Sequence, residues 1–133
     1  MPHIYVEVSP SVYRKIGKKG RKALNAEWKK LGAESMKGYS DKPMTIKDVD
    51  IRWVKVYSSE GTAAVTLIVQ FTAGGPNGVL INKVNDLCER INYVFIMALT
   101  MSKARAKYLT GMDIGIIPRP QQRGGYHHHT FKD

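Results

Sequence analysis

Pro2 is the residue whose chemistry depends most on its place in this sequence. Removal of Met1, which a small and conformationally fixed second residue usually permits, turns Pro2 into a secondary amine on a rigid ring. A neutral amine held at a fixed position is a general base that takes and returns a proton. The alternative is a structural role, because proline is tolerated at the start of a strand, where its missing N–H lies outside the ladder.

The length of 133 residues is enough for one domain that buries its own core without disulfides or metal. We expect that domain to span residues 1–120, followed by a polar tail at 121–133. Cys88 is the single cysteine, so the chain contains no disulfide framework, which suits a reducing compartment. Because Cys88 falls in an apolar helical stripe, we expect a buried small hydrophobe and not a nucleophile.

The amino end lacks the basic segment and apolar run of a signal peptide. The longest apolar stretch, residues 94–99, is far shorter than the roughly 20 residues that a membrane-spanning helix needs. We therefore expect a cytoplasmic protein with no membrane partner. The formal net charge of +10 attracts anions, whether nucleic acid, an acidic surface or a small polycarboxylate, and does not choose among them.

Three adjacent histidines, His127 to His129, lie in the Gly-rich tail. Imidazole is a common metal ligand, but adjacent histidines lack the ligand spacing of a preformed metal site. We expect no metal centre here, and instead a mobile tail or a flap over the pocket of a neighbouring subunit.

Periodicity places the elements that must position these residues. Ile4, Val6 and Val8 alternate with more polar side chains, as in a half-buried strand at the start of the chain. Apolar residues at three- and four-residue spacing predict two helices. The expected order is a strand over 4–8, a helix over 12–31 with Gly32 as C-cap, strands over 48–57 and 62–71, a helix over 80–99 with Asn77 as N-cap, and a strand over 112–117 ended by Pro118 and Pro120.

This order is strand–helix–strand twice, which predicts an α/β (α+β) two-layer sandwich. Two β-α-β units form one four-stranded mixed sheet with two helices on one face. The run over 62–71 is apolar on both sides, so we place it in the middle of the sheet. Two folds share the element order: the tautomerase fold and, as the alternative, the ferredoxin-like fold.

The opening Met1-Pro2-His3, followed by a strand with a Val6-Glu7 pair, resembles the 5-carboxymethyl-2-hydroxymuconate isomerase branch of the tautomerase superfamily. Later stretches agree in order and spacing. They are the strand, Gly-rich turn and long helix over 65–99, Lys107-Tyr108-Leu109 before the last strand, and a Tyr- and His-containing tail near Phe131-Lys132.

The resemblance implies a cofactor-independent isomerase of aromatic-compound catabolism, assembled as a homotrimer. In such an enzyme neutral Pro2 moves a proton in a small anionic dienol or 2-oxo acid. Cations that hold the substrate carboxylates would also disfavour the protonated amine and lower its pKa toward neutrality.

The chain departs from the family pattern in the turn after the third strand, where the family has an arginine and this chain has Gly74-Gly75-Pro76-Asn77-Gly78. Arg52 is the best remaining candidate to bind a substrate carboxylate, followed by Arg119. His3, beside Pro2, either tunes the amine or fills space.

Two other functions stay open at this stage. The polar side of the helix over 12–31 is rich in Lys and Arg and is either a solvated face or a nucleic-acid-binding surface. A small oligomeric structural protein without catalysis, in which exposed sheet edges pair between subunits, is the second alternative.

Overall fold

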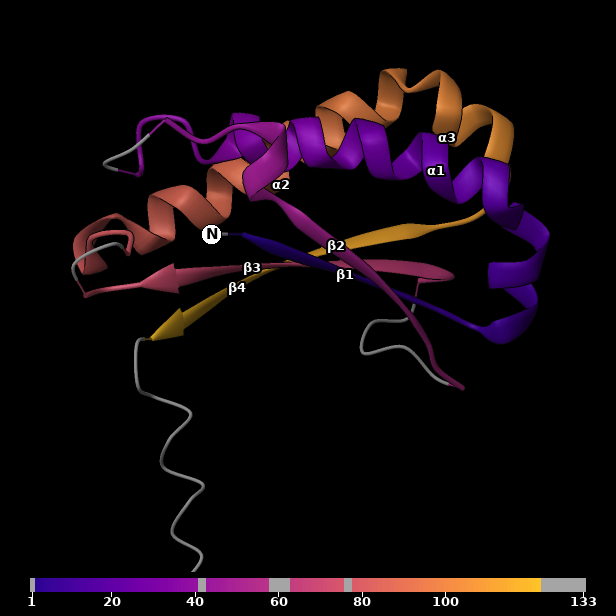
Figure 1. The fold of residues 1–133 in the computed structure, drawn as a ribbon, viewed down its shortest axis with the longest axis horizontal. Helices are drawn as coiled ribbons and strands as arrows, with labels where there is room; N and C mark the ends of the chain where they lie inside the picture. Colours follow the sequence, from indigo (N-terminus) through magenta and orange to yellow (C-terminus); the bar gives the residue numbers. More distant parts are fainter. Residues whose placement is uncertain (1, 41–42, 58–62, 76–77, 123–133) are drawn as a thin grey trace, which may run out of the picture.

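The computed structural model describes residues 2–40, 43–57, 63–75 and 78–122 (Figure 1). Two sequence predictions, Asn77 as an N-cap and the role of His127–His129, lie outside these residues. The elements in chain order are β1 (His3–Val8), α1 (Pro10–Ser35), the 3-10 turn η1 (Ile46–Asp48), β2 (Asp50–Lys55), β3 (Val65–Ala73), the 3-10 turn η2 (Ile81–Lys83), α2 (Val84–Met101), α3 (Lys103–Tyr108) and β4 (Ile114–Gln122).

The four strands form one mixed sheet in the order β2-β1-β3-β4. Each β-α-β unit contributes a parallel pair, β1 with β2 and β3 with β4, and the two units meet at the antiparallel pair of β1 and β3. The predicted two-layer sandwich and the central place of β3 are confirmed. The ferredoxin-like alternative is wrong, because that fold separates the two strands of each unit by a third strand, and here they are neighbours.

The helices lie on one side of the sheet, and the other side carries none of the described helices (Figure 1). The alternation of β1 explains the core: Ile4, Val6 and Val8 are fully buried on the helix side, where Leu24 and Trp28 of α1 are also fully buried. Burying each such side chain contributes about 1.5–3 kcal/mol. None of the described helices is both long enough and apolar enough to cross a bilayer.

The first helix is longer than its pattern predicts. Ser9 caps it by accepting a hydrogen bond from the Val12 N–H, and Pro10 occupies the first turn. Gly17, at φ 75° and ψ 167°, kinks α1. The predicted C-cap at Gly32 is wrong: the helix runs on to Ser35, and Gly32 is buried within it. A Cβ at Gly32 would lie 3.1 Å from Cγ1 of Val49, so this glycine serves close packing and not helix termination.

The last strand continues past the two prolines that were expected to end it. β4 includes Pro118 and Pro120 and ends at Gln122. Among the described strands it lies at the edge and pairs with β3 alone. Residues two apart in a strand present their backbone N positions to the same side. Prolines at such spacing are accommodated on the unpaired side of an edge strand. The division of the chain at residue 120 into domain and tail stays a prediction.

Candidate functional site

Pro2 lies one residue before β1 and is buried. Its carbonyl oxygen accepts a hydrogen bond from the backbone N–H of Asp50, with an N···O distance of 3.2 Å. The ring is therefore held by the start of β2 as well as by the strand that it precedes. Two strands that converge on one residue restrict its backbone, which is what a proton-transferring group needs.

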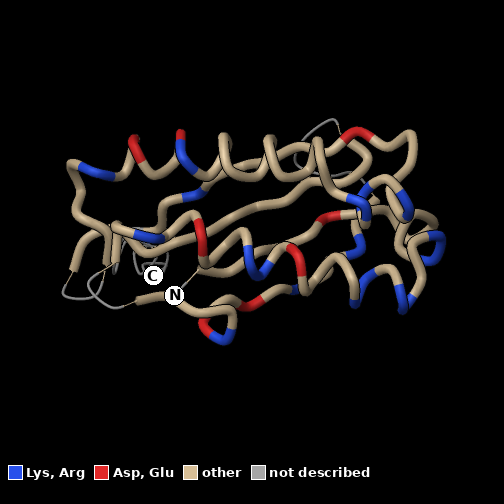
Figure 2. Tube along the Cα trace, turned by 90° about the horizontal axis from the view of Figure 1, so that it is seen from above, with Lys and Arg blue, Asp and Glu red and all other residues tan. Residues whose placement is uncertain are grey.

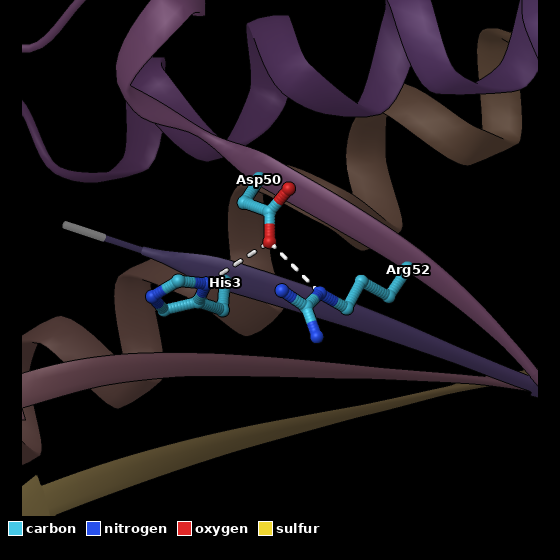
Figure 3. Close-up of polar contacts among 3 residues, drawn as sticks. All are labelled: His3, Asp50 and Arg52. Atoms are coloured by element: carbon cyan, nitrogen blue, oxygen red, sulfur yellow. Dashed lines mark hydrogen bonds and ion pairs between the residues drawn. The ribbon is translucent and has the colours of Figure 1, made fainter.

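Next to Pro2, two of the predicted site residues share one carboxylate. His3 Nδ1 lies 3.4 Å from Oδ2 of Asp50, and Arg52 Nε donates a hydrogen bond to the same oxygen at 3.2 Å. Figure 3 shows the three side chains on one side of the sheet, His3 from β1 and the other two from β2. The parallel register pairs His3 with Asp50, which explains why residues 47 positions apart meet.

The fourth predicted site residue, Arg119, lies in the same row across the sheet. Asp50 pairs with His3, His3 pairs with Gln70, and Gln70 pairs with Arg119. Paired residues on neighbouring strands point to the same face, and strands are about 4.8 Å apart, so the backbones of His3 and Arg119 are separated by about 10 Å. The row crosses the face without helices and begins next to Pro2.

The cluster is open to solvent, unlike Pro2. The side chain of Arg52 is 70% exposed and that of Asp50 is 43% exposed. An ion pair of this kind contributes about 0–1 kcal/mol. The guanidinium can therefore exchange the carboxylate of Asp50 for that of a ligand at small cost, and its remaining donors suit a second carboxylate.

Two cavities formed by the described residues lie elsewhere. One of about 910 Å³ is formed by the end of α1 with residues 43–47, and another of about 340 Å³ lies between α2, Arg105 and β4. Neither is lined by Pro2, His3, Arg52 or Arg119. Among the described residues, no group of three His, Cys, Asp or Glu is placed to hold a metal ion.

Cys88 is half-buried and packs against the core, and burial raises the pKa of its thiol. A raised thiol pKa lowers the fraction of nucleophilic thiolate.

Asp50 and Gln70 were not among the site residues predicted from the sequence, although both belong to this arrangement. The signal for Asp50 was present, because residues 50 and 52 of a strand point to the same face, and a carboxylate there meets Arg52. Gln70 gave no signal of its own, since its place depends on the antiparallel register of β1 with β3.

The protein is thus a small two-layer α/β domain in which Pro2, held through its carbonyl oxygen, lies next to a row of polar residues across the sheet. No family model and no curated protein matches this sequence. Solved structures are similar to it, and they include a 5-carboxymethyl-2-hydroxymuconate delta-isomerase, with 12% identity, a TM-score of 0.49, and coverage of 100% of this chain and 94% of that one.

A 5-carboxymethyl-2-hydroxymuconate isomerase from Deinococcus radiodurans R1 is similar with 10% identity and a TM-score of 0.46, over 99% of this chain and 88% of that one. A fused 4-OT asymmetric trimer is similar with 9% identity and a TM-score of 0.46, over 90% of this chain and 86% of that one. At these identities and scores the similarity concerns the arrangement of elements and not an activity.

Proposed function

We propose that this protein is a cofactor-independent isomerase that moves a proton in a small anionic dienol or 2-oxo acid, with Pro2 as the general base. The observation that supports this most directly is the anchoring of Pro2 at the start of β1 through its hydrogen bond to the backbone of Asp50. In this proposal Met1 is removed, and the ring nitrogen becomes a free amine at a fixed position.

The proposed reaction needs no group beyond the chain and its substrate. The neutral nitrogen of Pro2 takes the proton of an enol hydroxyl, and the O–H electron pair forms the new carbonyl bond. The electron pair of the C=C bond moves to the neighbouring carbon, which then takes the proton back from the amine. One proton moves from oxygen to carbon, and Pro2 returns to its starting state.

We propose that the substrate carries a carboxylate, because the guanidinium of Arg52 contacts Asp50, whose backbone binds the carbonyl of Pro2. Arg52 is the first candidate to bind that carboxylate, through a guanidinium that Asp50 already orients. Arg119 is the second candidate, in the row that includes His3. His3 lies against Asp50 and Tyr5, and in this proposal it shapes the space beside the amine.

We further propose a homotrimer in the cytoplasm, with a role in the breakdown of aromatic compounds. The sheet face without helices is the surface that further copies of the chain would cover. It carries the polar row together with partly exposed apolar groups such as Tyr5 and Ile117. In this proposal a neighbouring copy also encloses Pro2 and Arg52, which line neither of the two cavities described above.

Two measurements test the base. Intact mass spectrometry of the purified protein should show a chain that lacks Met1. Ketonisation of the enol of phenylpyruvate should be catalysed by the wild type and slowed on the order of 100-fold in Pro2→Ala, because general-base catalysis contributes about 10²–10⁴-fold.

Pro43→Ala is the matched control, since it makes the same change at an exposed proline outside the site. It should keep the wild-type rate. Equal rates for Pro2→Ala and the wild type would remove Pro2 from the mechanism. Retention of Met1 would do the same, because the nitrogen would then be an amide.

A further inference from the structure

The positive charge of this protein is concentrated on two helices. α1 and α3 together carry 11 of the 21 Lys and Arg residues and 2 of the 11 acidic residues, so nine of the ten net positive charges lie on them. Residues 10–26 and 103–112 contain no acidic residue at all. The rest of the chain is therefore close to electrically neutral.

The two helices lie together, so their charges form one surface. The ring of Tyr108, at the end of α3, packs against Gly20 of α1, and Ser102 at the start of α3 donates a hydrogen bond to Glu27 of α1. Figure 2 shows Lys and Arg gathered at the right-hand end of the molecule, where Figure 1 places α3 and the beginning of α1. The basic surface, as we define it, consists of the exposed side chains of Lys15, Lys18, Lys19, Lys22, Lys103 and Lys107.

These lysines are not balanced by acidic side chains of the described residues, and Lys107 Nζ lies 5.3 Å from the ring centroid of Tyr108. Among the described residues, none of the six takes part in an ion pair. Lys18 and Lys22 are one helical turn apart in the part of α1 after the kink at Gly17, and Lys103 and Lys107 are one turn apart in α3. Uncompensated like charges at such spacing cost stability, which is the expected cost of a surface that receives an anionic partner.

The side chains of this surface favour a nucleic acid over a membrane. Helices that bind membranes insert an apolar face beside their charges. Here the apolar face of α1, with Ile16, Leu24 and Trp28, is buried in the core. The exposed large hydrophobic side chains among the described residues all lie outside α1 and α3. Attraction to phosphates by charge alone is the basis of non-specific nucleic-acid binding.

An aromatic group lies at the edge of this surface. Arg21 lies over the ring of Tyr13, with Cζ 3.8 Å from the ring centroid, and Lys55 Nζ lies 5.0 Å from the same centroid. This contact brings the end of β2 to the beginning of α1. Tyr57 follows two residues after Lys55 and is 100% exposed. A fully exposed ring suits stacking against an unpaired base.

From this charge and its placement we infer that the basic surface binds the phosphate backbone of nucleic acid without sequence preference. It is separate from the site around Pro2, because its lysines lie on the helices and the polar row lies on the other face of the sheet. Binding by this surface does not require the proposed isomerase activity.

The test is fluorescence anisotropy of the full chain with labelled single-stranded and duplex oligonucleotides of mixed sequence. Six phosphate contacts predict that binding to duplex weakens by about a thousandfold between ~50 and ~200 mM salt. Replacing Lys15, Lys18 and Lys22 by Gln should weaken binding at low salt by about tenfold or more. The same triple variant should reduce the slope of log affinity against log salt by about 2 to 3.

The matched control replaces Lys37, Lys47 and Lys83 by Gln, which removes three exposed positive charges outside the basic surface. The two triple variants therefore have the same net charge. It should bind nearly as the wild type does. Equal weakening by the two variants, or no binding of the wild type at low salt, overturns the inference. So does tighter binding to vesicles that contain phosphatidylserine than to either oligonucleotide, with the same loss in the Lys15, Lys18 and Lys22 variant.

Discussion

Asp50 influences three of the residues around the candidate site. Its backbone N–H binds the carbonyl of Pro2, and one carboxylate oxygen contacts both His3 and Arg52. Because the ion pair is exposed, it orients the guanidinium of Arg52 without holding it strongly. A substrate carboxylate can then take the place of Asp50, so the residue acts as a positioning group in the proposed mechanism.

A second carboxylate gives a prediction that concerns stability alone. Asp48 accepts hydrogen bonds at Oδ2 from the backbone N–H and the hydroxyl of Thr45, at 2.8 Å and 3.0 Å. The backbone hydrogen bond, and next the hydroxyl bond, hold the pKa of Asp48 below its ordinary value of 3.8. Because the pKa is lower in the folded state, the stabilisation is present above pH 3.8 and is lost as the pH falls through the folded-state pKa.

We therefore expect Asp48→Asn to be less stable than the wild type at neutral pH in urea unfolding. The difference should shrink as the pH is lowered below 3.8, since both side chains are then uncharged. Lys47→Gln, in the same turn, should shift the stability by an amount that does not follow this pH dependence. A difference between Asp48→Asn and the wild type that stays constant into acid would contradict the assigned cause.

At the scale of the elements, the contact between α1 and α3 depends on Gly20. A Cβ at this position would lie 2.7 Å from Cδ1 of Tyr108 and 2.9 Å from Cγ2 of Ile16. By helix propensity alone, glycine at this position makes α1 roughly 1 kcal/mol less stable than alanine would. In return, the aromatic ring of α3 approaches the backbone of α1 closely.

We predict that Gly20→Ala lowers the free energy of unfolding by about 1–3 kcal/mol, because overpacking outweighs the gain in helix propensity. The cost should be smaller when Tyr108 is first changed to Ala, since the closest contact is then removed. A double-mutant cycle by urea denaturation measures this coupling. An additive cycle, or a stabilised Gly20→Ala, would show that the two helices do not pack as described.

At the scale of the whole molecule, the described helices cover one face of the sheet and none of them lies on the other (Figure 1). Among the described strands, β2 and β4 are the edges of the sheet, and each pairs on one side only. Exposed sheet edges and faces favour association with other chains. Assembly through this face would leave the basic surface on α1 and α3 accessible, so the two proposed functions do not compete for the same part of the molecule.

The proposed trimer predicts a native mass of about three times the 14.9 kDa of one chain in sedimentation. Tyr5→Glu, on the uncovered face of β1, should shift the protein toward smaller species, because burying an unpaired carboxylate in an interface is unfavourable. Tyr93→Glu makes the same change on α2, where the side chain is 67% exposed, and should leave the mass unchanged. A monomeric wild type, or equal effects of the two changes, would contradict assembly through the sheet.

The local sequence pattern was enough to predict much of the secondary structure of this protein. The alternation of Ile4, Val6 and Val8 was enough to predict β1 and its buried side, because strand residues point alternately to the two faces. Apolar periodicity likewise predicted both long helices. It did not predict where α1 ends, because Gly32 is kept inside the helix by its contacts with Val49 and Ile4, which come from other elements.

For the candidate site, the residue types can be read from the sequence, whereas their arrangement depends on contacts between distant segments. Pro2, His3, Arg52 and Arg119 were recognisable as residue types that bind anions or transfer protons. Their arrangement required the order β2-β1-β3-β4 and its registers, because only these bring positions 3, 50, 70 and 119 into one row. Sequence alone determined the order of the four strands and two long helices, the net charge and the chemistry that each residue can carry. Tertiary structure decided between the two possible folds and brought the charges of α1 and α3 together, since pairing between distant segments depends on the packing of the whole chain and not on local preference.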